Sequence, residues 1–247
     1  MEEEPVFCYS IVDMKADGGY GDVIVKNILI KDSVLEKMAA IRHCNKRDTW
    51  IVIQHWKTDE YYAYLLTPSG LNSPVISSTG FIINGSVLNT IGTLKFSGKG
   101  NKLAACHAFD NDAVQLMDFD NTTGVISNSL VFYPNAIPHQ NSYTGVYGAE
   151  FSPDGNYLYV STDDGVNLSC YDVQNGNAVA MPNVNTATLS DFRYSMIETG
   201  KDQNLYLVCQ ECIVNGNVTT ILGQISNPDN PSTAQFDANY LDIGYSH

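Results

Sequence analysis

Short apolar runs separated by polar turns recur along the chain. Three segments share one order: an apolar strand, a turn rich in Gly, Asp, Lys and Asn, and a second apolar strand. They are Ile91–Cys106, Tyr147–Ser161 and Asp191–Cys209, and Met38–Ile53 is a fourth copy with a slightly longer turn. Repetition of this kind predicts stacked copies of one supersecondary unit.

One apolar position in each copy gives the period of the repeat. Ile41, Phe96, Phe151 and Ile197 are separated by 55, 55 and 46 positions. This period is too long for a leucine-rich repeat and is close to that of four-stranded propeller blades.

Further strands follow each hairpin. Third strands are expected at Tyr61–Leu66, Val114–Phe119, Leu168–Val173 and Thr220–Ile225. More irregular fourth strands come next, as at 125–132 and 178–181. Near the N-terminus, the runs 7–14 and 22–30 match a third and a fourth strand alone.

We therefore predict an all-β chain, a β-propeller segment of four-stranded antiparallel blades that forms an incomplete ring. About four full blades and one half blade are expected. The half blade covers 6–31, and the full blades cover 35–80, 90–133, 146–182 and 191–243. Only Ser33–Lys37 suggests a helical turn.

Composition narrows the classes of partner. The net charge of −14 and the sequence pI near 4.5 disfavour binding to nucleic acid, because an acidic surface repels phosphates. No apolar run approaches the ~20 residues that span a bilayer, so we expect no membrane insertion. The opening Met1-Glu-Glu-Glu-Pro is unlike a signal peptide.

The ends of the second strands carry the candidate site. In the repeat register, seven side chains fall on one face of the ring: His55, Trp56, His107, Asp110, Asp163, Asp164 and Glu211. Imidazoles and carboxylates on one rim could bind a sugar or a metal, and an exposed Trp56 could stack on a sugar. The competing interpretation is a set of ordinary solvated loop residues.

Calcium is the one cofactor that the acidic loops suggest. Asp110-Asn-Asp112 and Asp163-Asp-Gly165 offer hard oxygen ligands, but neither completes an EF-hand loop. We assign no metal site and no catalytic residue, because enzyme motifs such as G-x-S-x-G and the phosphate-binding loop are absent from the sequence.

Several motifs together resemble a known group of proteins. Lys37–Trp56, Tyr61–Leu71 and Tyr147–Ser161 resemble the propeller region of large secreted proteins of gliding bacteria. Tyr9–Met14 and Leu116–Asn128 fit the same pattern. Those proteins use type IX secretion and often end in a gliding-motility-associated, type B sorting domain. The Ser-Pro-Asp-Gly hairpin is also shared with WD40-like and lactonase-like propellers.

The resemblance implies a function and a location. We expect a non-catalytic binding or scaffold module rather than an enzyme, located outside the cell or on its surface, where it would serve adhesion or capture of a carbohydrate or protein. The resemblance also implies that this chain is an interior slice of a ring, and exposed blade faces would favour self-association. One alternative is a lactonase-like hydrolase that uses the rim carboxylates with His55 or His107. Another is an intracellular interaction propeller.

Overall fold

The computed structural model describes residues 4–109, 112–134, 145–162, 168–184, 193–214 and 217–243. Its strands form five antiparallel sheets, which confirms the predicted all-β propeller class. The first sheet is a hairpin of β1 (Phe7–Asp13) and β2 (Asp22–Lys31). Within the described ranges the only helices are two short 3-10 turns, η1 (Asp17–Gly19) and η2 (Val87–Thr90), and none is long and apolar enough to cross a membrane.

The next two sheets are complete blades. One contains β3 (Val34–Arg42), β4 (Thr49–His55), β5 (Glu60–Thr67), β6 (Gly70–Leu71) and β7 (Val75–Ser78). The other contains β8 (Leu94–Phe96), β9 (Lys102–His107), β10 (Ala113–Phe119) and β11 (Ile126–Phe132). In both blades the strands pair largely in chain order, since short turns join antiparallel neighbours.

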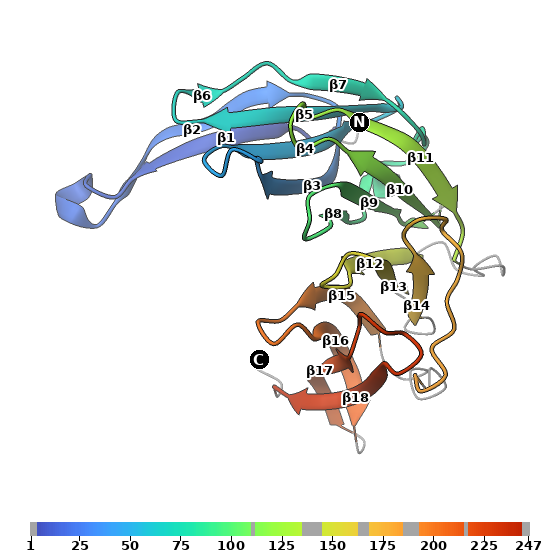
Figure 1. The fold of residues 1–247 in the computed structure, drawn as a ribbon. Helices are drawn as coiled ribbons and strands as arrows, with labels where there is room; N and C mark the ends of the chain where they lie inside the picture. Colours follow the sequence, from blue (N-terminus) through green and yellow to red (C-terminus); the bar gives the residue numbers. More distant parts are fainter. Residues whose placement is uncertain are drawn as a thin grey trace.

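Two more sheets follow. The first contains β12 (Val146–Phe151), β13 (Tyr157–Thr162) and β14 (Leu168–Asp172). The last contains β15 (Arg193–Thr199), β16 (Leu205–Val214), β17 (Asn217–Ser226) and β18 (Gln235–Asp242). Figure 1 shows the sheets following one another around an open arc, from the blue β1–β2 hairpin to the red β18.

The structure corrects two local expectations. The segment expected to form a helical turn at Ser33–Lys37 lies mostly in β3, which begins at Val34. Its alternation of buried and exposed side chains from Leu35 onward is the period of two that a strand requires. The expected fourth strand at 178–181 is reduced, within the described residues, to one bridge between Tyr171 and Ala178.

The cores lie between neighbouring blades. Leu103 and Ala105 of β9 pack toward the β3–β7 blade, whereas Ala104 and Cys106 pack toward β12–β14. A third core joins the β12–β14 and β15–β18 sheets. Successive side chains of a strand point to opposite faces, so a central strand with a blade on each side is apolar at almost every position.

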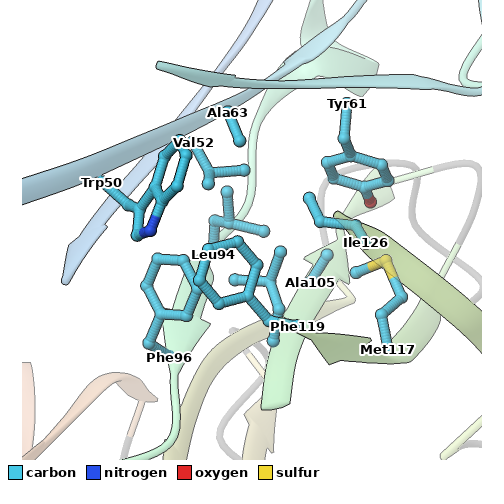
Figure 2. Packing of buried hydrophobic residues seen from close by; sticks show 11 residues of the cluster. Trp50, Val52, Tyr61, Ala63, Leu94, Phe96, Ala105, Met117, Phe119 and Ile126 are labelled. Carbon is cyan, nitrogen blue, oxygen red and sulfur yellow. The ribbon is translucent and has the colours of Figure 1, made fainter. Parts of the chain in front are cut away.

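Trp50 is central to the core between the second and third sheets. Figure 2 shows its ring, on β4, approaching Phe96 and Phe119 of the next blade. The Trp50 and Phe119 rings meet edge to face at 6.1 Å, and Trp50 Nε1 donates to the Asn121 carbonyl oxygen at 2.9 Å. A Cβ at Gly124, where φ is +79°, would lie 2.6 Å from the indole. The contact between the two blades therefore needs the large side chain of Trp50 and a glycine at position 124.

We predict that Trp50→Ala lowers the free energy of unfolding by about 3–5 kcal/mol, because it leaves a cavity between two blades and frees the Asn121 carbonyl. Urea denaturation followed by fluorescence and circular dichroism measures this loss. Ile76→Ala, at an exposed position on β7, is the control and should cost less than about 1 kcal/mol. Equal losses in both variants would contradict the assignment.

Candidate functional site

The inner strands of four sheets surround a cleft on the inside of the arc. It has a volume of about 530 Å³. It is lined by β3, by β8 and the residues next to it, by β12 and by β15. Its polar walls include Glu36, Lys37, Lys95, Tyr147 and Glu198, and its apolar walls include Met38, Ile41, Leu94, Phe96 and Met196. A cleft of this volume is of the size that holds a small ligand.

Lys95 forms ion pairs that connect three blades at this cleft. Its Nζ lies 2.8 Å from Glu150 Oε2 and 2.6 Å from Glu198 Oε2. Lys95 is on β8, Glu150 on β12 and Glu198 on β15. The ion pairs therefore cross two blade boundaries.

The three charges differ in burial. The Glu150 side chain is 7% exposed and the Glu198 side chain is 63% exposed. Burial raises the pKa of the Glu150 carboxyl, although Lys95 acts in the opposite direction. Burial also lowers the pKa of Lys95, but the hydrogen bonds to Glu150 and Glu198 outweigh it, and the net pKa is raised. The ammonium therefore keeps its proton, with one carboxylate beneath it and one reaching solvent.

A second polar group lies buried where the second and third sheets meet. Lys37 Nζ is 2.7 Å from both the Cys106 carbonyl oxygen and His107 Nδ1. His107 Nε2 lies 3.3 Å from Gln115 Oε1, which also accepts a hydrogen bond from Tyr61 Oη at 2.7 Å. These bonds form a continuous chain from β3 to β5.

Burial dominates the titration of this network. It lowers the pKa of Lys37 to about 7 and that of His107 well below its ordinary value. Gly92 packs closely against it, since a Cβ there would collide with the Cys106 carbonyl oxygen and lie 3.1 Å from Lys37 Nζ. Lys37 thus lies in a tight, low-dielectric site that favours the neutral amine.

The structure separates the residues predicted for the rim. His55 is half-buried beside Lys31, Glu60 and Tyr62, with Nδ1 3.4 Å from Glu60 Oε2. His107 is fully buried in the Lys37 network and stacks on Phe81. Among the described residues, the two imidazoles therefore have different neighbours.

Trp56 corrects an expectation. Stacking on a sugar would need an exposed Trp56, but the side chain is only 6% exposed and packs with Leu35 and Ile83. The Lys57 ammonium lies over the Trp56 ring, 3.9 Å from the ring centroid. The segment that contains Ile83 lies on the indole, so Trp56 offers little surface to a sugar.

The acidic part of the predicted rim cannot be placed. Asp110, Asp163 and Asp164 lie outside the described residues, and Glu211 lies in β16 with its side chain outside the described part. Of the expected calcium ligands around them, Asp112 is described, and its Oδ1 accepts a hydrogen bond from the Val146 backbone N–H at 2.9 Å. Within the part that is described, no group of three or more His, Cys, Asp or Glu side chains could hold a metal ion.

Sequence reasoning missed the cleft residues, although the repeat contains a signal for them. Lys95 and Glu150 each stand immediately before an anchor residue, Phe96 and Phe151. A charge beside the anchor of an apolar inner strand is unusual, and comparing the copies position by position would have found both. The register gives no indication that the two charges meet.

Known structures share the fold. The periplasmic gluconolactonase of Pseudomonas aeruginosa matches with a TM-score of 0.59 at 12% identity, over 98% of this chain and 65% of that one. A protein of Bacteroides uniformis proposed to be a 6-phosphogluconolactonase matches with a TM-score of 0.57 at 16% identity, over 96% and 65%. A Lactobacillus plantarum protein matches with a TM-score of 0.55 at 13% identity, over 89% and 61%.

These matches show the propeller fold alone, because the identities are low. The chain spans 61–65% of the length of these three structures. No family model and no curated protein sequence matches it. The prediction of a non-enzymatic chain is nevertheless contradicted, since several similar structures carry lactonase names.

The buried amine gives a pH-dependent stability. The pKa of Lys37 is about 7 in the folded chain and 10.5 as its ordinary value. Below pH 7 both states hold the proton, and the buried charge destabilises the fold fully. Between these two values the unfolded chain binds more protons, so stability rises with pH.

We predict that the free energy of unfolding of the wild type, relative to Lys37→Met, rises by about 1 kcal/mol per pH unit from pH 7 to 8.5. Denaturant titrations at several pH values measure the difference. Lys46→Met, at an exposed turn position, is the control and should run parallel to the wild type. A pH-independent difference between wild type and Lys37→Met would refute a neutral buried amine.

Proposed function

We propose that this chain supplies the central cleft of a propeller hydrolase that opens a small, sugar-derived lactone. The observation that carries the proposal is the Lys95 ammonium held between Glu150 and Glu198 at the cleft wall. The lactonase names of similar structures support the same class of reaction.

Lys95 supplies the electrophilic group. An ammonium has three N–H donors, and two of those on Lys95 are directed to Glu150 and Glu198. The third can donate to the carbonyl oxygen of a lactone. As that oxygen becomes negative during attack, the fixed ammonium stabilises it more than it stabilises the ground state.

Glu198 supplies the base. Its exposed carboxylate takes a proton from water as the water oxygen bonds to the carbonyl carbon. The ring C–O bond then breaks, and the leaving oxygen takes the proton back from Glu198. The product is an open hydroxy acid, and no other reactant is consumed.

Glu150 is a positioning residue. Its buried carboxylate holds Lys95 from below and accepts from the Phe151 backbone N–H at 3.0 Å. Loss of Glu150 would leave the ammonium free to pair with Glu198 alone. We expect such a change to lower kcat more than it raises KM, because orientation matters most in the transition state.

Location and export stay proposals that rest on sequence resemblance. We keep the extracellular or cell-surface location as an expectation from the gliding-bacterial motifs. The comparisons give no support to gliding or type IX secretion. A sugar lactone can be present either inside or outside a cell, so the proposed chemistry does not depend on location.

We predict that the chain accelerates the hydrolysis of glucono-δ-lactone or its 6-phosphate above the buffer rate, and that Lys95→Met lowers kcat about 100-fold or more. Acid release followed with a pH indicator measures the rate. Lys102→Met is the matched control, because Lys102 is similarly exposed and pairs with Asp118 at 2.6 Å. It should keep the wild-type rate.

Two outcomes would overturn the proposal. One is a rate equal to that of buffer for both lactones with a folded protein. The other is turnover that Lys95→Met and Lys102→Met reduce equally. Binding of either lactone without turnover would favour ligand capture instead.

A further inference from the structure

The β1–β2 hairpin differs from the other sheets. It has two strands, whereas the β8–β11 and β15–β18 sheets have four. Within the described residues, β1 pairs with β2 and with no other strand. Figure 1 shows the hairpin extending away from the arc, and only its base packs on the next blade, through Phe7 and Ile30. One edge of β1 therefore presents unpaired backbone groups.

This hairpin is the most apolar exposed element of the described chain. Large side chains are exposed along both strands and the turn between them: Tyr9, Ile11, Val12, Met14, Tyr20, Val23, Ile24, Ile28 and Leu29. Val12 and Ile24 are each 56% exposed. Large exposed apolar side chains gathered on one element usually mark an interaction site.

The charge of the hairpin identifies a suitable partner. The whole chain carries a net charge of −14, but residues 6–31 contain three Asp and three Lys and are neutral. Two copies of so acidic a chain repel each other over most of their surfaces. The hairpin is a place where a second copy can approach without that penalty.

The two edges of the hairpin are not equivalent. Between Phe7↔Lys31 and Val12↔Val23 the register shifts three times, and each shift places the extra residue in β2. Bulges of this kind bend a strand and block pairing at its outer edge. β1 carries no extra residue, so its free edge keeps the regular spacing that pairing needs.

We propose that β1 pairs antiparallel with β1 of a second copy, so that two hairpins form one four-stranded sheet. A twofold axis at Ser10 makes the strand self-complementary. Tyr9 then lies opposite Ile11 of the second copy, and Cys8 lies opposite Val12. Aromatic and β-branched side chains in such cross-strand pairs stabilise a sheet.

A crosslink tests this register. Val12→Cys places a thiol opposite the native, exposed Cys8 of the second copy. The two positions are four residues apart in one strand, about 13 Å, so they cannot form a disulfide within one chain. We expect mild oxidation to give a disulfide-linked dimer whose bond, identified by mass spectrometry, joins positions 8 and 12. Val23→Cys, opposite Val12 on β2, is the matched control and should give no such bond.

Sedimentation velocity over a range of concentrations supplies the second readout. We expect a reversible dimer whose dissociation constant rises at least about tenfold in Ile11→Lys, because a charge at the centre of the seam opposes pairing. Ile24→Lys, on β2 and outside the seam, should leave dimerisation within about threefold.

Three results would overturn the proposal. One is a wild type that stays a monomer at every concentration, because β1 would then have no partner copy. A dimer that survives Ile11→Lys and gives no bond between positions 8 and 12 would use another surface. Assemblies that grow beyond a dimer would mean head-to-tail contact instead of a twofold seam.

Discussion

The bridging ammonium of Lys95 is the interaction on which both the shape of the cleft and its proposed chemistry depend. It binds carboxylates from two other blades, Glu150 at 2.8 Å and Glu198 at 2.6 Å. Removing one partner of a buried pair leaves an uncompensated charge, which is far more costly than replacing the whole pair. The three side chains therefore act as a unit. The same unit places a cation and an exposed carboxylate side by side, as hydrolysis of a lactone requires.

The apolar packing between blades keeps these charges in place. Phe96 follows Lys95, and its ring centroid lies 4.8 Å from that of Phe119. Phe151 follows Glu150 and lies in the core between the third and fourth sheets. Each charged residue is thus next to an anchored side chain on a short inner strand. Because close-packed cores transmit small shifts, the geometry of the cleft follows from the fit between blades. The buried Lys37 network adds polar bonds across one of these boundaries.

The sequence predicts the sheets well because period-two alternation and turn residues are local signals. Ile41, Phe96, Phe151 and Ile197 all lie in first strands, β3, β8, β12 and β15. The site is harder to predict, because convergence depends on angles between blades. His107 ends an apolar strand, and it is buried by side chains from other strands and loops, Lys37 and Phe81 among them. Trp56 is covered by the segment that contains Ile83, and no hydrophobic periodicity in the sequence predicts this contact.

A crystal structure with gluconolactam would show whether Lys95 receives the carbonyl oxygen of a lactone, because the lactam keeps the ring carbonyl and resists hydrolysis. We predict that the lactam binds in the central cleft with its carbonyl oxygen at hydrogen-bonding distance from Lys95 Nζ, about 2.7–3.2 Å. Glu198 should then lie on the side from which water attacks. A lactam bound at His55, or a cleft left empty at saturating lactam, would contradict it.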